Sequence, residues 1–154
     1  MRRIALLLLA AFSVGALAAT LPYDPSANAK QDVAKAFAAA KSRHVPVLIV
    51  FGANWCEDCR ALDGALRKER AASLMTGSFQ VVKVDVGEFD RNLDVNATYG
   101  DPIKGGIPAA VLVAPEGKLL YSTKAGELAN ARTMSESSIY DFFKRVSQGA
   151  AAKK

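Results

Sequence analysis

Residues 45–60 read VPVLIVFGANWCEDCR and hold both cysteines of the chain. The part at 45–53 is a continuous apolar run rich in β-branched and aromatic residues, which predicts a strand buried on both faces. The cysteines follow it with two residues between them. A disulfide between positions this close in sequence closes almost no loop, so it would add little stability as a structural cross-link. The pair therefore indicates chemistry rather than reinforcement.

The residues after the strand predict a helix that begins near the first cysteine. From Glu57 to about Leu74, apolar residues recur at helical spacing. Only a thiolate attacks a disulfide, and the free N–H groups and dipole of a helix N-terminus favour that anion. Two intervening residues keep the second sulfur within one helical turn. Cys56 and Cys59 are therefore suited to a reversible dithiol–disulfide couple.

The remaining pattern predicts one α/β domain with a central mixed sheet flanked by helices. Helices between the early strands imply parallel pairing, and the turn PEGK between the last two strands implies an antiparallel hairpin. An N-terminal helix precedes the first strand, and the hairpin is followed by a last helix. The further expected elements are helices at 24–44, 88–100 and 133–146 and strands at 79–86, 109–114 and 118–124.

Capping residues suggest where the first and last helices begin. Asp24 is the expected N-cap of the first helix, with Pro25 at its first position. His44, the single histidine, is expected to end that helix rather than to serve as a ligand or base. Thr133 and Glu136 have the spacing of a capping box for the last helix.

The N-terminus has the pattern of a secretory signal peptide, assigned to residues 1–19. A basic start is followed by an apolar stretch that ends in small residues, which fits cleavage after Ala18 or Ala19. An uncleaved anchor is the alternative, although the apolar stretch is short for a membrane span. The domain would then occupy 20–150, and 151–154 would be a disordered tail. Export places the cysteines in an oxidising compartment, here the periplasm.

The charge of the chain argues against a nucleic-acid partner. The formal net charge is +5, and loss of Arg2 and Arg3 with the signal peptide would leave +3. This charge is spread along the chain and forms no basic run with interleaved aromatic residues. We therefore expect no nucleic acid as a partner, and we expect a monomer.

Two motifs, together with the order of elements, resemble the thioredoxin superfamily. The first is WCEDCR at 55–60, at the start of a helix after a buried strand. The second is GGIP at 105–108, just before the hairpin, which is similar to the cis-proline loop of that family. The resemblance covers roughly 27–147, nearly the whole predicted domain. It is most similar to exported thioredoxin-like proteins with an added N-terminal helix.

The resemblance implies roles for five residues. Cys56 would be the exposed, attacking thiol and Cys59 the buried, resolving thiol of a redox-active disulfide. Trp55 would shield the site. Pro108 would lie opposite the cysteines in a cis peptide bond, and the backbone of Ile107 would pair with an extended substrate segment. No cofactor and no metal ion are implied.

The chain departs from the family where a buried acid is often found. Many thioredoxins have an aspartate six residues before the first cysteine, and this chain has Val50 there. Lys83 matches a lysine often found near that acid, and without its partner we expect it to be solvated. The group that exchanges a proton with Cys59 is left open: water, Glu57, Asp58 or another residue.

The two acidic residues between the cysteines form a second departure. Carboxylates at a helix start favour the helix, but each disfavours a thiolate ~6 Å away by on the order of 1 kcal/mol. We expect Glu57 and Asp58 to be exposed and to tune the couple toward a reductant. The alternative is that they only help to start the helix.

These observations predict a periplasmic thiol–disulfide oxidoreductase with a reductive role. Its substrates would be exported proteins or cytochrome apoproteins, and its electrons would come from a membrane protein. The alternative is a carrier that binds copper or zinc through the two thiolates. Two sulfurs leave a zinc site incomplete, whereas monovalent copper can be held by two. The sequence names neither the substrate nor the redox partner.

Overall fold

The computed structural model describes residues 21–123 and 126–151. The predicted signal peptide and residues 152–154 of the predicted tail lie outside them. Among the described residues, none of the helices is long and apolar enough to span a membrane. The elements in chain order are α1 (Ala29–Arg43), β1 (Val47–Gly52), α2 (Glu57–Leu66), α3 (Glu69–Ser78), β2 (Gln80–Asp85), α4 (Leu93–Thr98), the 3₁₀ helix η1 (Pro102–Gly105), β3 (Ala109–Val113), β4 (Leu119–Ser122), the 3₁₀ helix η2 (Ala131–Thr133) and α5 (Glu136–Ala151).

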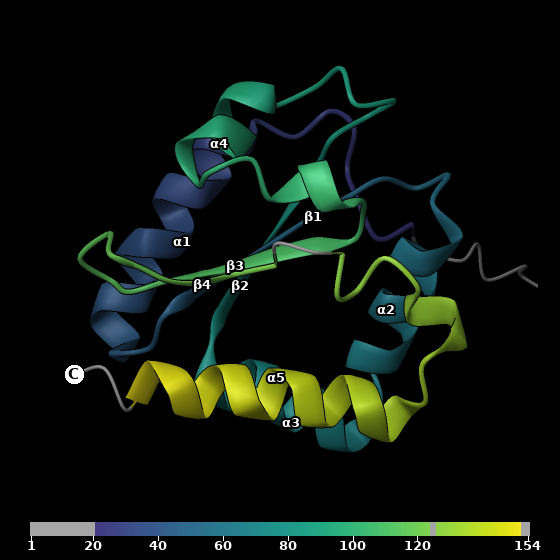
Figure 1. Ribbon diagram of the computed structural model, residues 1–154. Helices are drawn as coiled ribbons and strands as arrows, with labels where there is room; N and C mark the ends of the chain where they lie inside the picture. The colour runs from purple at the N-terminus through teal and green to yellow at the C-terminus, as the bar shows by residue number, and fades with distance from the viewer. Residues whose placement is uncertain (1–20, 124–125, 152–154) are drawn as a thin grey trace, which may run out of the picture.

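The sheet has the strand order β2-β1-β3-β4, so β1 lies inside it. Strand β1 pairs in parallel with β2 and antiparallel with β3, and β3 and β4 form the expected hairpin. The predicted α/β class and the mixed sheet are confirmed. Figure 1 shows α1 and α4 on one side of the sheet and α2, α3 and α5 on the other.

Strand β1 is apolar throughout because helices cover both faces of the sheet. Ile49 and Phe51 belong to the core under α1, whereas Leu48 and Val50 belong to the core under α2, α3 and α5. Every residue of the strand is buried. The strand predicted at 45–53 is therefore confirmed, and it forms a rigid support for the segment that follows.

Strand β2 confirms the strand predicted at 79–86, and it lies at the edge of the sheet. Val82 and Val84 still alternate into the core under α1, which covers this edge. A helix that covers an edge strand gives it the apolar pattern of a central one. The sequence pattern therefore could not locate the edge.

The single helix predicted from Glu57 to Leu74 is wrong, because the chain breaks it into α2 and α3. Arg67 and Lys68 connect them, and Lys68 has an extended backbone. Both residues are good helix formers, so no local signal marks the break. The apolar stripe continues across it because both helices pack on the same core.

Both predicted helix starts are displaced by a few residues. Asn28 caps α1 by accepting a hydrogen bond from the Gln31 N–H at 3.1 Å, while Asp24 accepts one from Ser26 in the turn before it. The last helix begins at Glu136, and the hydroxyl oxygen of Ser135 just before it accepts a hydrogen bond from the Ser138 N–H at 3.1 Å.

The remaining terminal residues show which capping residues the chain uses. Thr133 is not a cap, because its hydroxyl donates to the Asn130 carbonyl within η2. His44 ends α1 in the left-handed conformation, as expected of a C-cap. Each helix start offers several capping residues close together, so the choice depends on tertiary packing.

Candidate active site

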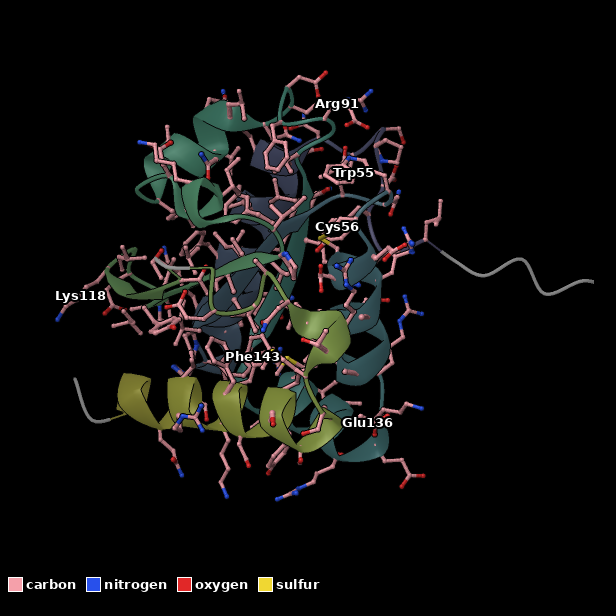
Figure 2. The ribbon with its side chains drawn as sticks, turned by 45° about the vertical axis from the view of Figure 1, so that its right-hand side comes forward. Trp55, Cys56, Arg91, Lys118, Glu136 and Phe143 are labelled. Carbon is pink, nitrogen blue, oxygen red and sulfur yellow. A yellow bond between two sulfur atoms is a disulfide. The ribbon has the colours of Figure 1, made fainter. Side chains whose placement is uncertain are left out.

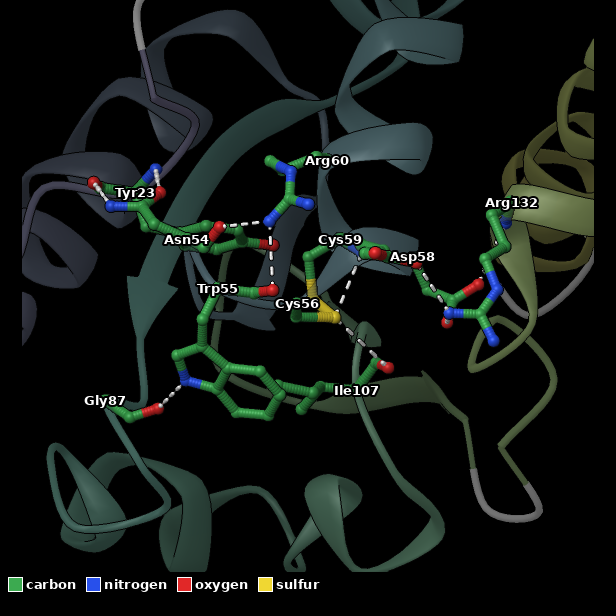
Figure 3. Close-up of a disulfide and its surroundings, with 11 residues drawn as sticks. Tyr23, Asn54, Trp55, Cys56, Asp58, Cys59, Arg60, Gly87, Ile107 and Arg132 are labelled. Carbon is green, nitrogen blue, oxygen red and sulfur yellow. Dashed lines mark hydrogen bonds and ion pairs between the residues drawn. A yellow bond between two sulfur atoms is a disulfide. The ribbon is translucent and has the colours of Figure 1, made fainter.

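The two cysteines lie at the junction between the end of β1 and the start of α2. Cys56 is the N-cap of α2, and its Sγ accepts a hydrogen bond from the Cys59 N–H at 3.1 Å (Figure 3). The two residues are joined as a disulfide. The same free N–H groups at the helix start favour a thiolate at Cys56 when the pair is reduced.

The second motif lies directly against the first. The Ile107 carbonyl oxygen is 3.7 Å from Cys56 Sγ, although the two residues are 51 positions apart in sequence. The Ile107–Pro108 peptide bond is cis. Strand β3 begins at the next residue, so the loop before it is fixed to the centre of the sheet beside β1.

Burial differs between the cysteines, but less than expected. Cys59 is 1% exposed and Cys56 is 6% exposed. The expectation of an exposed Cys56 is therefore wrong for the disulfide form, because the Ile107 loop closes over its sulfur. Cys56 is still the more accessible of the two.

Trp55 lies beside the disulfide with 48% of its surface exposed. Its Nε1 donates to the Gly87 carbonyl at 2.8 Å, and its ring meets Phe89 edge to face at a centroid distance of 5.9 Å. Phe89 is 44% exposed and has a positive φ of 64°. The two rings form an exposed aromatic surface next to Cys56. Figure 2 shows Trp55 and Cys56 at the end of the molecule away from Lys118 in the hairpin turn.

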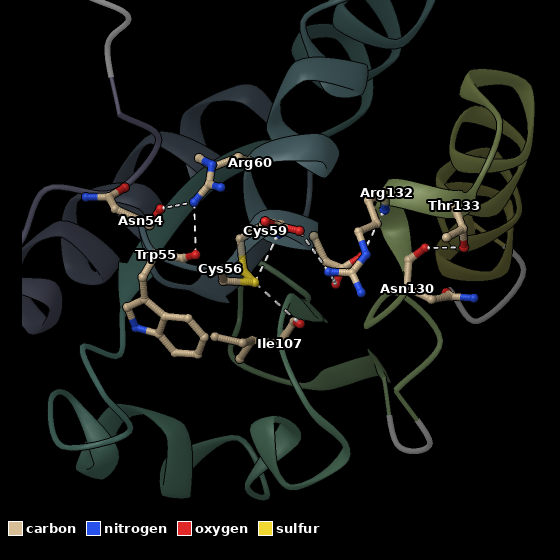
Figure 4. A network of polar contacts seen from close by, with 11 residues as sticks. Asn54, Trp55, Cys56, Cys59, Arg60, Ile107, Asn130, Arg132 and Thr133 are labelled. Atoms are coloured by element: carbon tan, nitrogen blue, oxygen red, sulfur yellow. Dashed lines mark hydrogen bonds and ion pairs between the residues drawn. A yellow bond between two sulfur atoms is a disulfide. The ribbon is translucent and has the colours of Figure 1, made fainter.

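The turn that carries Trp55 is held from both ends. Arg60 in α2 donates to the carbonyls of Asn54 at 2.6 Å and Trp55 at 2.9 Å (Figure 4). Asn54 in turn exchanges two hydrogen bonds with the backbone of Tyr23, at 2.9 and 2.7 Å. The position of Cys56 is therefore set by a helix residue and by the segment before α1.

Comparison with known proteins agrees with this geometry. A model of the thioredoxin-like family matches residues 28–115. The chain belongs to this family. A structure described as a disulphide isomerase from Xylella fastidiosa Temecula1 is 57% identical, has a TM-score of 0.82, and is matched over 84% of this chain and 98% of that chain. No curated protein matches the chain.

Two more distant structures share the thioredoxin-like fold. A DsbH oxidoreductase is 19% identical, with a TM-score of 0.57 over 75% of this chain and 81% of that chain. The oxidised C-terminal domain of DsbD from Neisseria meningitidis is 17% identical, with a TM-score of 0.55 over 77% and 96%. The family, the fold and the Cys56–Cys59 disulfide make this protein a thiol:disulfide oxidoreductase.

In this thioredoxin-like protein, the acidic pair between the cysteines is partly neutralised. The Arg132 backbone N–H donates to Asp58 at 2.9 Å, and its guanidinium lies 3.0 Å from Glu57 and 3.6 Å from Asp58. Asp58 is only 9% exposed, so the expectation that both carboxylates are exposed is wrong for Asp58. No sequence pattern indicated Arg132, which lies in η2, 74 positions after Asp58.

The position of the usual family acid is filled by a buried Val50 in the core under α2. Lys83, its register partner on β2, is not simply solvated as expected, because it forms an ion pair with Asp63 of α2. Arg67 also contacts Asp63, at 2.7 Å. Asp63 lies one turn beyond Cys59. The four-residue spacing from Cys59 to Asp63 was visible in the sequence, but no local pattern indicated that Lys83 of β2 lies beside Asp63.

Among residues 21–123 and 126–151, no group of three or more His, Cys, Asp or Glu side chains is arranged to hold a metal ion. The carrier alternative would therefore depend on the two sulfurs alone. Such a site could suit monovalent copper but not the four ligands that structural zinc requires.

Proposed function

We propose that this protein works in the periplasm in its reduced form, reducing disulfides of exported proteins or cytochrome apoproteins. The observation that carries this proposal is the position of Cys56 Sγ, between the first N–H groups of α2 and the Ile107 carbonyl. A sulfur held there can be stabilised as a thiolate on one side and meet an extended substrate on the other.

The reaction begins at the Cys56 thiolate. Its sulfur attacks one sulfur of a substrate disulfide, and the other substrate sulfur leaves as a thiolate that takes a proton from solvent. Cys59 then loses its proton and attacks Cys56 Sγ. The mixed disulfide breaks, the substrate leaves with both sulfurs reduced, and the protein keeps the Cys56–Cys59 disulfide.

Substrate binding in this proposal uses backbone and aromatic contacts beside Cys56. The Ile107 segment, with Pro108, would pair with an extended stretch of substrate as a short added strand. The exposed rings of Trp55 and Phe89 would cover apolar residues next to the target cysteine. Trp55 would also shield the mixed disulfide from water.

Two features support the reductive direction. Glu57 and Asp58 follow Cys56 directly and disfavour its thiolate, and the Arg132 side chain and the Arg60 guanidinium at the Asn54 and Trp55 carbonyls offset this effect in part. A relative 57% identical is described as a disulphide isomerase. Isomerisation also starts from attack by a reduced cysteine, so both activities require a protein that is kept reduced.

The reductive role requires a source of electrons outside the protein. Export through cleavage after Ala18 or Ala19 would separate the protein from cytosolic reductants, so we propose that a membrane protein supplies its electrons. The active protein would be a monomer, because one chain holds both cysteines and the Ile107 loop.

The deciding experiment measures the redox state and the activity of the same protein. We expect alkylation of intact cells to trap Cys56 and Cys59 mainly as thiols in the periplasmic fraction. The purified reduced protein should reduce insulin and should rescue a substrate with mispaired disulfides. A mainly oxidised pair in cells would contradict the reductive role, and retention of one copper ion per chain without insulin reduction would favour the carrier.

A further inference from the structure

Tyr23 lies behind the disulfide, on the side away from the Ile107 loop. Its backbone forms two hydrogen bonds with the Asn54 side chain, and the residue is 4% exposed. A Cβ atom placed on Gly52 would lie 2.9 Å from Cys59 Sγ and closer still to the Tyr23 hydroxyl oxygen. The phenol and the buried sulfur therefore both lie beside Gly52, which has no side chain to separate them.

Two carboxylates face the same place. The parallel register pairs Gly52 with Asp85, which is 8% exposed at the end of β2. Asp63, one turn after Cys59 on α2, has a side chain that is 12% exposed. Burial, and then the negative charges of Asp63 and Asp85, raise the pKa of the Tyr23 phenol well above its ordinary value.

A phenol in this environment stays protonated at neutral pH, so it cannot serve as a base itself. It can accept a hydrogen bond or a proton at its oxygen while donating its own proton onward. Cys59 must lose a proton before it can attack, and its 1% exposure limits direct access by water. The usual acid is replaced by Val50, so another route is required.

The geometry points to a proton relay in which the Tyr23 hydroxyl connects the Cys59 thiol to the carboxylates of Asp63 and Asp85. This inference rests on the proposed roles of the two cysteines. As Cys59 Sγ attacks Cys56 Sγ, its proton passes to the Tyr23 oxygen and the phenol proton passes to a carboxylate. The electron pair on Cys59 forms the new S–S bond, and the substrate sulfur leaves with the electrons of the old one.

Each of the two carboxylates of the relay also lies near cations. Asp63 is held by two cations, Lys83 and Arg67, while Arg91 approaches Asp85 at 3.9 Å. The negative charges of both carboxylates act on the phenol, and in this proposal one of them receives its proton. The structure therefore assigns Tyr23 the shared position, and substitution of each acid tests the last step.

The test follows the two sulfur steps separately. The reduced protein is mixed with a chromogenic aryl disulfide, which releases one coloured thiolate when Cys56 attacks and a second when Cys59 resolves. We expect Tyr23→Phe to slow the second release about 100-fold near pH 6, at the low end of the range for loss of acid–base catalysis. The first release should keep its wild-type rate.

The pH profile separates a relay from a packing role. Near pH 9 the higher hydroxide concentration removes the Cys59 proton more readily without the relay, so the difference between Tyr23→Phe and the wild type should shrink. The groups facing the relay are Cys59, the two acids and the cations Lys83, Arg67 and Arg91. Tyr99→Phe is the matched control, because Tyr99 packs against the core under α1 at the end of α4.

Each outcome of these measurements either supports or overturns the relay. Asp63→Asn or Asp85→Asn should reproduce the slow second release, and the variant that does so identifies the acceptor. An unchanged second release in Tyr23→Phe, an equal slowing at all pH values, or no effect of either acid would overturn the relay. Absence of the first release in the wild type would instead contradict the proposed function. Thermal unfolding of each variant checks that it is folded.

Discussion

The two cysteines are bonded to each other but face different surroundings. Cys56 meets a helix N-terminus, the Ile107 carbonyl and an exposed tryptophan, all groups that can act on a substrate. Cys59 is buried, with its sulfur and the Tyr23 phenol both beside Gly52. The difference indicates that Cys56 lies on the side that a substrate can approach, whereas any proton that Cys59 loses must leave through the interior of the protein.

The largest effect should come from removing each sulfur in turn. We expect Cys56→Ser to abolish insulin reduction, because no nucleophile is left at the surface. Cys59→Ser should attack substrates but fail to resolve, and so accumulate mixed disulfides that are visible by mass spectrometry. Accumulation of mixed disulfides in Cys56→Ser instead would reverse the assignment of the attacking and the resolving cysteine.

The next effect tests the contact between Tyr23 and Cys59. Gly52→Ala places a methyl group against both side chains, so we expect the free energy of unfolding to fall by about 2–3 kcal/mol. Gly64→Ala in α2 is the control, because no other atoms lie within 4 Å of the new methyl group. It should stabilise the helix by about 0.5–1 kcal/mol. Urea unfolding of both variants measures the contrast, and equal effects would contradict the close packing at Gly52.

Alkaline pH should lower the free energy of unfolding through the buried Tyr23 phenol. The raised pKa of Tyr23 means that the folded protein keeps the phenol proton after the unfolded chain, with an ordinary pKa of about 10, has lost it. The stabilisation is complete below pH ~10 and is lost at about 1.4 kcal/mol per pH unit above it. Tyr23→Phe should lack this extra slope in urea unfolding measured from about pH 9 to 11. Parallel slopes would contradict the burial of an un-ionised phenol.

The smallest effect concerns the charges of Glu57, Asp58 and Arg132 beside Cys56. Arg132→Gln leaves Glu57 and Asp58 without their cation, so the Cys56 thiolate becomes less favourable and the reduction potential should fall by up to about 30 mV. Arg70→Gln is the control, because Arg70 stacks on Tyr140 instead.

The opposite change sharpens this result. Glu57→Gln should raise the potential by a smaller amount, and added salt should reduce its effect because the Glu57 side chain is 64% exposed. Redox titration against glutathione at low and high salt measures both variants. A rise with Arg132→Gln would show that hydrogen bonds to the sulfur, rather than these charges, control the couple.

The surroundings of Cys56 were largely predictable from sequence, and the surroundings of Cys59 were not. The buried strand, the helix start at Cys56 and the Ile107–Pro108 loop each leave a pattern within a few residues. The prediction erred where contacts join distant segments. Asp58 was expected to be exposed because Arg132 could not be seen next to it, and Lys83 was expected to be solvated because Asp63 could not be placed beside it.

Taken by itself, the sequence determined the chemistry of the sulfur pair and the elements that present it. Strand preference and helix-start electrostatics act over one or two turns of chain, so they can be read from neighbouring residues. Only the tertiary structure decided what lies behind Cys59. Gly52, Asp63 and Asp85 come from β1, α2 and β2, and Tyr23 comes from the segment before α1; the parallel β1–β2 register and the packing of α2 on β1 bring these residues into one region.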